Sequence, residues 1–402
     1  MSGLLETASA SHAGAESAVR QALIARNEIA QSFFSGQALG LARASSEMAA
    51  RFLRGGRLLA FGRGPYASDA QHVAVEFVHP VIVGKRALPA LDLSIEFAAW
   101  ITAILRPEDI VMGFGPPAGD DAVTAVLRAA HRRGAMTFAL PGEAGSYAVA
   151  LTSRDPFVHQ ELVEILYHTL WETVHVFLEH RELGHDVGAA AFLYPFLGQT
   201  TQDAEAIVED VAVSILHKVD DDAALRKKVA EEQADAIAAA VQAIHARVTA
   251  GGKLILFGNG GSATDANDWT LDCVHPPKTY RSIPAISLAS EPATITAISN
   301  DVGLEVSFLR QLIAHARPED VAIAISTSGG SKNVIAALEY ARRHGLLTVG
   351  LLGYDGGEIV RRALVDMAIV VDSNYIPRIQ EVQASIYHVM RDSEGAMSDG
   401  ER

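Results

Sequence analysis

The chain has 402 residues, of which 49% are hydrophobic and 20% charged, a composition typical of globular proteins with more than one buried core. Its formal net charge of −15 argues against sequence-independent binding to nucleic acid or to anionic membranes. The single cysteine, Cys273, excludes an intrachain disulfide framework and a cysteine-rich zinc site. No apolar run approaches the roughly 18 residues of a membrane span and no signal-peptide pattern opens the chain, so we expect a cytoplasmic protein with no nucleic-acid or membrane partner.

The first half of the chain predicts a helical arm followed by an α/β unit. Residues 15–54 are rich in Ala, Leu, Glu and Arg, and they predict two helices with an interruption at Ser35-Gly36. Apolar runs then alternate with helix-like segments, which predicts βαβ crossovers and a parallel sheet covered on both faces. Strands are expected at 58–61, 88–93, 109–114 and 136–140, and helices at 68–77, 97–105, 122–133 and about 159–181.

The second half predicts the same order of elements. Residues 184–199 carry Gly and Pro without helical periodicity, so we place a linker at 183–204 between a first domain at 1–182 and a second at 205–402. A helical stretch of about 203–250, with a break near Asp220-Asp221-Asp222, opens the second domain. Strands are expected at 254–257, 283–288, 321–325, 348–352 and 367–371, with a final helix at about 379–390.

Three sequence patterns occur once in each half and in the same order. FGNGGSATDANDWTLD at 257–272 echoes FGRGPYASDAQHVAVE at 61–76, at a constant offset of 196 residues. RPED occurs at 106–109 and at 317–320. A Gln-Glu pair with a histidine eight residues after the glutamine occurs at 160–168 and at 380–388. These matches predict an internal duplication.

A loop rich in hydroxyl side chains, STSGGS at 326–331, follows a predicted strand and opens a predicted helix. The free backbone N–H groups and the dipole of a helix N-terminus attract anions, which predicts a phosphate site; the alternative is a serine-rich cap and turn without a ligand. The aligned loop of the first half, GPPAGD at 115–120, has no hydroxyl group, two prolines that cannot donate, and an aspartate that would repel phosphate. We therefore expect phosphate binding in the second half alone.

Histidine and carboxylate side chains of the first half form a candidate metal or acid–base site. His72 and Glu76 are four residues apart on a predicted helix, and Gln160 and His168 are eight apart on another, so each pair lies on one helix face. Together they can provide two nitrogen and two oxygen ligands for a divalent ion such as zinc. The alternative is a solvated helix face and a buried structural histidine.

The second half keeps Gln380 and His388 but replaces the other two side chains by Asp268 and Asp272. Aspartate is one methylene shorter than glutamate, and one imidazole is lost. These substitutions argue against an equivalent second metal site.

Five segments of the second half resemble the sugar isomerase (SIS) family, and phosphoheptose isomerases, which act on sedoheptulose 7-phosphate, in particular. They are FGNGGSATDAND, IPAISLAS, ISND, ISTSGGSKNV and PRIQEVQASIYH. The resemblance is strong over about 205–395 and looser over about 15–182. It implies an α/β fold with two tandem SIS domains, each a five-stranded parallel sheet flanked by helices and preceded by a helical arm. It also implies a homodimer that is a pseudo-tetramer of SIS domains, and no nucleotide cofactor.

The resemblance also implies roles for individual residues. In the family a glutamate acts as base, a histidine as acid, and zinc is often bound; this implies Glu76 as base, His168 or His388 as acid, and His72, Glu76, Gln160 and His168 as zinc ligands. The first half lacks a counterpart of about 294–311. The candidate substrate-binding residues are Asn259, Gly260, Ser262, Asn300, Asp301, Ser326, Thr327, Ser328, Ser331, Arg378 and Gln380.

We therefore expect an aldose–ketose isomerase, an intramolecular oxidoreductase that converts sedoheptulose 7-phosphate to a heptose 7-phosphate through an enediol. Its site would be composite, with phosphosugar contacts from the second half and Glu76 and His72 from the first. One alternative is a non-catalytic phosphosugar-binding protein with a regulatory or assembly role. Another is an isomerase of a different ketose phosphate.

Overall fold

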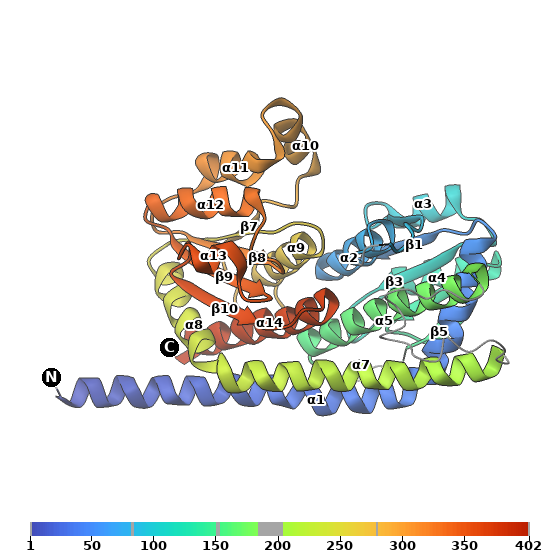
Figure 1. Cartoon of the computed structure of the whole chain (residues 1–402), viewed down its shortest axis with the longest axis horizontal. Helices are drawn as coiled ribbons and strands as arrows, with labels where there is room; N and C mark the ends of the chain where they lie inside the picture. Colours follow the sequence, from blue (N-terminus) through green and yellow to red (C-terminus); the bar gives the residue numbers. More distant parts are fainter. Residues whose placement is uncertain (1, 82–83, 150–152, 184–203, 279, 401–402) are drawn as a thin grey trace. The chain divides into compact units, whose positions relative to one another are not determined.

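The computed structural model describes residues 2–81, 84–149, 153–183, 204–278 and 280–400. Contacts divide the chain into one unit of Glu28–Asp221 and another of Met1–Asn27 with Asp222–Arg402 (Figure 1). Helices α1 (Ser2–Leu53) and α7 (Ala204–Glu232) each contribute residues to both units. The linker expected at 183–204 lies, apart from its two end residues, outside the described residues.

The unit Glu28–Asp221 contains a five-stranded sheet in the order β2-β1-β3-β4-β5, and its strands pair in parallel, as predicted. Alternate side chains of β1 enter different cores: Leu58 and Ala60 pack with α1, α2 and α5, and Leu59 and Phe61 with α3 and α4. Burial on both faces explains the continuous apolar runs. The bounds are β1 Leu58–Gly62, α2 Ala67–Val78, β2 Ala90–Asp92, α3 Phe97–Ile104, β3 Ile110–Phe114, α4 Asp121–Arg132, β4 Met136–Leu140, β5 Tyr147–Ala148 and α5 Pro156–Leu183.

The other unit repeats this topology with a five-stranded sheet in the order β7-β6-β8-β9-β10, again parallel. One core lies between the sheet and α8, α9 and α14, and the other includes α11 and α12. The bounds are α8 Ala234–Thr249, β6 Leu254–Phe257, α9 Gly261–Val274, β7 Ala285–Ser287, α10 Pro292–Asp301, α11 Ser307–His315, β8 Val321–Ser326, α12 Lys332–Arg343, β9 Leu347–Gly353, α13 Gly357–Arg361, β10 Met367–Val371 and α14 Ile376–Gly400.

The repeated RPED motif has the same structural role in both units. Asp109 is buried before β3, accepts hydrogen bonds from the backbone N–H groups of Arg57 (3.0 Å) and Arg106 (2.8 Å), and forms an ion pair with the Arg57 side chain. Asp320, before β8, accepts the same two backbone bonds, from Lys253 (3.0 Å) and Arg317 (2.8 Å). The aspartate of the motif therefore holds the starts of neighbouring strands together, and this structural role explains why the motif occurs in both units.

Between β7 and β8 the chain forms α10, a 3₁₀ turn at Leu304–Val306 (η3) and α11, whereas between β2 and β3 the described residues form one helix, α3. This agrees with the expectation that the first half lacks a counterpart of about 294–311. Among the described residues, none of the helices combines the length and the apolar character needed to cross a membrane.

Two predicted helix interruptions are wrong. α1 continues through Ser35 and Gly36, because Phe34, Ala38 and Leu41 are buried on either side of them and this packing offsets the cost of about 1 kcal/mol for a glycine in a helix. The helical stretch expected at about 203–250 is interrupted at Gln233, between α7 and α8.

The expected break at Asp220-Asp221-Asp222 does not occur, because these residues lie inside α7. Asp222 is fully buried there and is paired 2.5 Å from Arg226, one turn later on the same helix.

Candidate functional site

The hydroxyl-rich loop of the second half lies where β8 ends and α12 is about to begin, the usual position of a ligand site in a parallel sheet. The backbone of the loop is held by its own side chains. Ser326 Oγ accepts a hydrogen bond from the Gly329 N–H (3.1 Å), and Ser328 Oγ accepts one from the Gly330 N–H (3.3 Å). These two side chains therefore stabilise the conformation of the loop.

The loop packs closely against the turn at Gly356-Gly357, backbone against backbone. Gly329 has φ +58°, and a Cβ there would lie 2.1 Å from the carbonyl oxygen of Gly356. Gly357 also has φ +58°, and its Cβ would lie 2.2 Å from the carbonyl oxygen of Ser328. Sequence reasoning missed Gly356 and Gly357, although the Asp-Gly-Gly sequence after β9 is a turn signal.

The Ser/Thr loop leaves the start of α12 without a carboxylate cap. Ser331 is the N-cap residue of α12 and makes no side-chain capping bond, and Thr327 is half-buried in the same loop. In the first half, by contrast, Asp120 Oδ1 accepts from the N–H groups of Ala122 (2.9 Å) and Val123 (3.0 Å) and so occupies the N-terminus of α4 with a negative charge. The first loop thus provides its own anion.

The glycine turn before α9 is tied to the same region. Asn259 and Asn333 exchange two side-chain hydrogen bonds, of 3.0 and 2.8 Å, and Asn333 also donates to Ser307 Oγ (3.3 Å). Gly260 is the N-cap residue with φ +58°, and Ser262 is buried in the first turn of α9. Sequence reasoning missed the role of Asn333, which connects the turn to α12.

Four further predicted substrate-binding residues lie on α10 and α14. Asn300 donates to Asp301 Oδ1 (2.9 Å), and both are exposed at the end of α10. Arg378 is buried and forms an ion pair with Glu381, and Gln380 is buried on the same helix. The Arg378 guanidinium is therefore engaged within α14.

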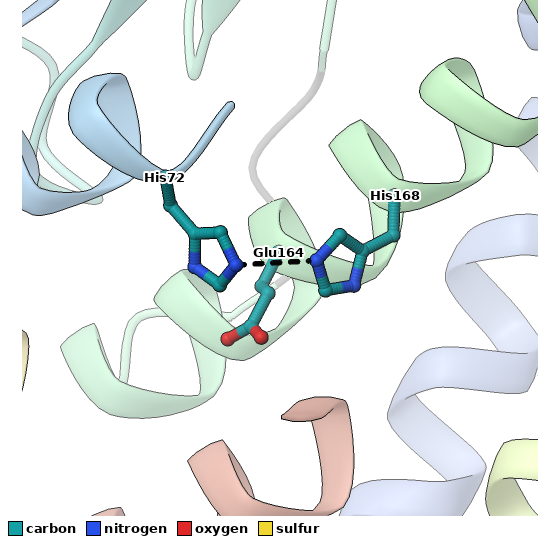
Figure 2. Close-up of side chains that lie close together, drawn as sticks. All are labelled: His72, Glu164 and His168. Carbon is teal, nitrogen blue, oxygen red and sulfur yellow. Dashed lines mark hydrogen bonds between the residues drawn. The ribbon is translucent and has the colours of Figure 1, made fainter. Parts of the chain in front are cut away.

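In the first half, His72 on α2 and His168 on α5 point their rings toward each other, with the carboxylate of Glu164 beside them (Figure 2). The two Nε2 atoms are 3.4 Å apart, and ligand atoms of all three buried side chains lie within 4.8 Å of one another. Sequence reasoning missed Glu164, although it lies one helical turn before His168 on the same face of α5.

Of the other two predicted metal ligands, Glu76 lies beside His72, and Gln160 contacts residues one turn before His72 on α2. Glu76 Oε1 is 3.9 Å from His72 Nε2, and the Gln160 amide donates to Asp69 Oδ2 (3.3 Å) and to Ser68 Oγ (3.4 Å). Burial, with a smaller effect of the Glu172 charge, raises the pKa of Glu76 to about 8. Its Oε2 atom is buried and accepts no hydrogen bond from a described residue.

The second half also gathers ligand-type side chains, despite the substitutions that argued against a site there. Asp268, Asp272 and His388 are buried together, with His388 Nε2 3.6 Å from Asp268 and 3.3 Å from Asp272. Tyr387 donates to Asp268 Oδ2 (2.7 Å). Burial, followed by the negative charge of Asp268, raises the pKa of Asp272 to about 6.

Comparison with known proteins identifies the family. A model described as the SIS domain matches residues 219–353. The chain is 44% identical over 162 residues to the phosphoheptose isomerase of Geobacter sp. (strain M21), a match that covers 40% of this chain and 83% of the relative. The chain belongs to the SIS domain family. A second SIS relative, the phosphoheptose isomerase of Trichlorobacter lovleyi, is 41% identical over 179 residues, which cover 44% of this chain and 90% of that protein.

A solved structure supports the tandem arrangement of two SIS domains. The C-terminal domain of glucosamine-fructose-6-phosphate aminotransferase from Francisella tularensis matches with a TM-score of 0.62. The match covers 94% of this chain and 95% of that one at 9% sequence identity. At this identity the match concerns the fold alone, an α/β fold with two parallel sheets.

Proposed function

We propose that this protein is an aldose–ketose isomerase and that its substrate is sedoheptulose 7-phosphate. The observation that carries the proposal is the Ser/Thr loop at the end of β8, whose backbone is held by Ser326 and Ser328 and which leads into α12 without a carboxylate cap. The 41 and 44% identity to proteins named phosphoheptose isomerases supports this substrate class. The phosphate would be bound by the hydroxyl and N–H groups of 326–331, and the sugar by Asn259 and Ser262.

The reaction moves hydrogen between C1 and C2 of the sugar. A base removes a proton from C1 of the ketose while an acid gives a proton to the C2 oxygen, which forms a 1,2-enediol. The O1–H proton is then lost and a proton is returned to C2, so that C1 becomes the aldehyde and C2 carries a hydroxyl group. One carboxylate and one imidazole suffice for these transfers.

We assign the role of base to Glu76. Its carboxyl group is buried and has one oxygen without a hydrogen bond from a described residue, so that oxygen is available to accept a carbon-bound proton. Burial also raises its pKa, which makes the ionised carboxylate a stronger base. His388 would act as the acid where His168 Nε2 binds the metal ion described below, and either His168 or His388 where no ion is bound.

The residues around His72 fit a divalent metal ion. Two nitrogen ligands at the tetrahedral angle around zinc lie about 3.4 Å apart, and the two Nε2 atoms of His72 and His168 are separated by 3.4 Å. We propose that these histidines and Glu164 hold the ion, which leaves Glu76 to act as the base. A bound zinc ion would polarise the carbonyl group of the substrate.

A second candidate function is non-catalytic binding of a phosphosugar. It is favoured by the division of residues between the halves: Glu76 and His72 belong to the first half, in which Asp120 caps α4 and would repel a phosphate group. If the halves do not act together, the protein binds phosphosugars without converting them.

Two variants separate these functions. Ser328→Ala should weaken binding of sedoheptulose 7-phosphate in a calorimetric titration, because it removes a hydroxyl group from the loop. Glu76→Gln should bind the sugar as the unmodified protein does but should not isomerise it. A protein that binds sedoheptulose 7-phosphate with no turnover, even when supplied with zinc, would favour the second function, and full turnover by Glu76→Gln would refute the assigned base.

A further inference from the structure

The first half contains an open pocket of about 430 Å³, which is within the range of small-molecule sites. It lies where β1 and β2 end, so it occupies the edge of the parallel sheet at which ligands usually bind. Its polar lining comes from Arg63, Gln71, Asp92, Ser94 and Glu96, and Phe97 contributes an aromatic wall.

The charge of this pocket disfavours a phosphate group. Asp92 and Glu96 provide two carboxylates, and the one guanidinium group of the lining, that of Arg63, is already paired with Asp120 at 3.1 Å. Asp120 also caps α4 through two backbone N–H groups. An anion would therefore meet two uncompensated negative charges, whereas a cation would be attracted by them.

Several contacts hold the polar groups of the pocket in place. Asp92 Oδ1 accepts hydrogen bonds from the N–H (2.9 Å) and the Oγ (2.5 Å) of Ser94, and Ser94 Oγ accepts one from the Gly62 N–H (3.1 Å). Asp92 Oδ2 has no hydrogen-bond partner among the described residues. The Phe97 ring stacks on Phe61 with ring centroids 4.7 Å apart. The lining is thus preorganised around one carboxylate oxygen that remains available to a ligand.

Glu96 has an unusual backbone conformation for a non-glycine residue, with φ 57° and ψ 37°. Left-handed conformations of this kind cost about 1 kcal/mol or more and concentrate at functional sites. The Glu96 side chain makes no hydrogen bond to another described residue. Its counterpart Glu291 has an ordinary φ of −116° and uses its carboxylate to cap α10.

The acidic character of the pocket is specific to the first half. Asp92 and Gln71 align with Ser287 and Asn267 of the second half. There the serine hydroxyl donates to the asparagine at 2.7 Å, and neither side chain is charged.

We propose that this pocket binds a cationic, hydroxylated small molecule of the amino-sugar class. Asp92 and Glu96 would bind the ammonium group through charge-assisted hydrogen bonds. Gln71 would bind hydroxyl groups, and the Phe97 ring would contact the carbon skeleton.

The test is a calorimetric titration of the full-length protein with glucosamine, glucose and glucose 6-phosphate, at about pH 6.5, below the usual pKa of such an amine. Glucosamine should bind at least about tenfold more tightly than glucose. Glucose 6-phosphate should not displace it. Equal affinity for glucosamine and glucose, or displacement by the phosphosugar, would overturn the proposal.

Substitutions locate the binding to this pocket. Glu96→Gln should weaken glucosamine binding about tenfold without lowering the melting temperature, because the side chain makes no hydrogen bond to a described residue. Glu291→Gln, the matched change in the second half, and Ser328→Ala should leave glucosamine binding unchanged. Unchanged binding by Glu96→Gln would assign the glucosamine to another site and would refute the pocket, independently of any isomerase activity.

Discussion

The close backbone contact between Gly329 and Gly356 allows a test of the proposed phosphate site. Gly329→Ala places a Cβ 2.1 Å from the carbonyl oxygen of Gly356 at a residue with φ +58°. The left-handed conformation alone costs an alanine about 1–2 kcal/mol. The collision is with backbone atoms, which cannot rotate away, so the loop itself has to move. We expect a total loss of at least about 2 kcal/mol, or about 4–8 °C in melting temperature for a domain of this size.

The loop movement should weaken binding of sedoheptulose 7-phosphate at least tenfold, about 1.4 kcal/mol or more, because its N–H and hydroxyl groups lose their common orientation. Calorimetric titration and thermal unfolding measure the two effects. Gly330→Ala is the matched control, since its Cβ would meet no atom closer than 3.9 Å and its φ is not positive. Wild-type affinity and stability in Gly329→Ala, or equal damage from Gly330→Ala, would refute the role assigned to this loop.

Three further outcomes follow from other contacts. Burial lowers the pKa of His159 to about 4. Below about pH 6.5 the unfolded chain therefore binds more protons than the folded one, and the free energy of unfolding should decrease as the pH falls, by about 2 kcal/mol from this residue at about pH 5. Denaturant unfolding of His159→Gln should show a weaker pH dependence. Asp109→Ala and Asp320→Ala should each cost at least about 2 kcal/mol in the same assay, because each leaves two backbone N–H donors without their carboxylate acceptor; a loss in one half only would contradict their equivalence. Glu164→Gln should reduce the zinc content of the purified protein more than Gln160→Ala does, as measured by elemental analysis. The reverse order would indicate that Gln160, and not Glu164, is the zinc ligand.

The two parallel sheets were predictable because their central strands, among them β1, β3 and β8, are continuous apolar runs buried on both faces. Strand β5 was not predicted, because it has only two residues and neither is buried. The duplication was predictable because Asp109 and Asp320 perform the same structural task. The continuity of α1 was not, because the cost of Gly36 is visible in the sequence and the packing that offsets it is not.

The position of the loop at 326–331, between a strand and a helix, was predictable because one segment forms it, and its role in phosphate binding stays a prediction. The predicted site was incomplete where distant segments meet. Asn333 and Gly356 contribute through contacts with residues far away in the chain, and no local pattern marks them. Glu164 was different, since helical periodicity from His168 pointed to it. The grouping of Asp268 and Asp272 with His388 depended on how α9 packs on α14, which composition does not reveal.

The most direct test of the central claim is the isomerisation of sedoheptulose 7-phosphate by the Glu76→Gln protein, measured together with its affinity for the sugar. We expect unchanged binding, because we propose that the second half holds the phosphate, and a loss of turnover of at least about 100-fold, the usual contribution of a general base. The matched variant Asp272→Asn should lose less turnover than Glu76→Gln, because Asp272 contacts the candidate acid His388 but is not the proposed base. Full activity of Glu76→Gln with loss of activity in Asp272→Asn would contradict the assignment of Glu76 as the base and would place the base in the second half.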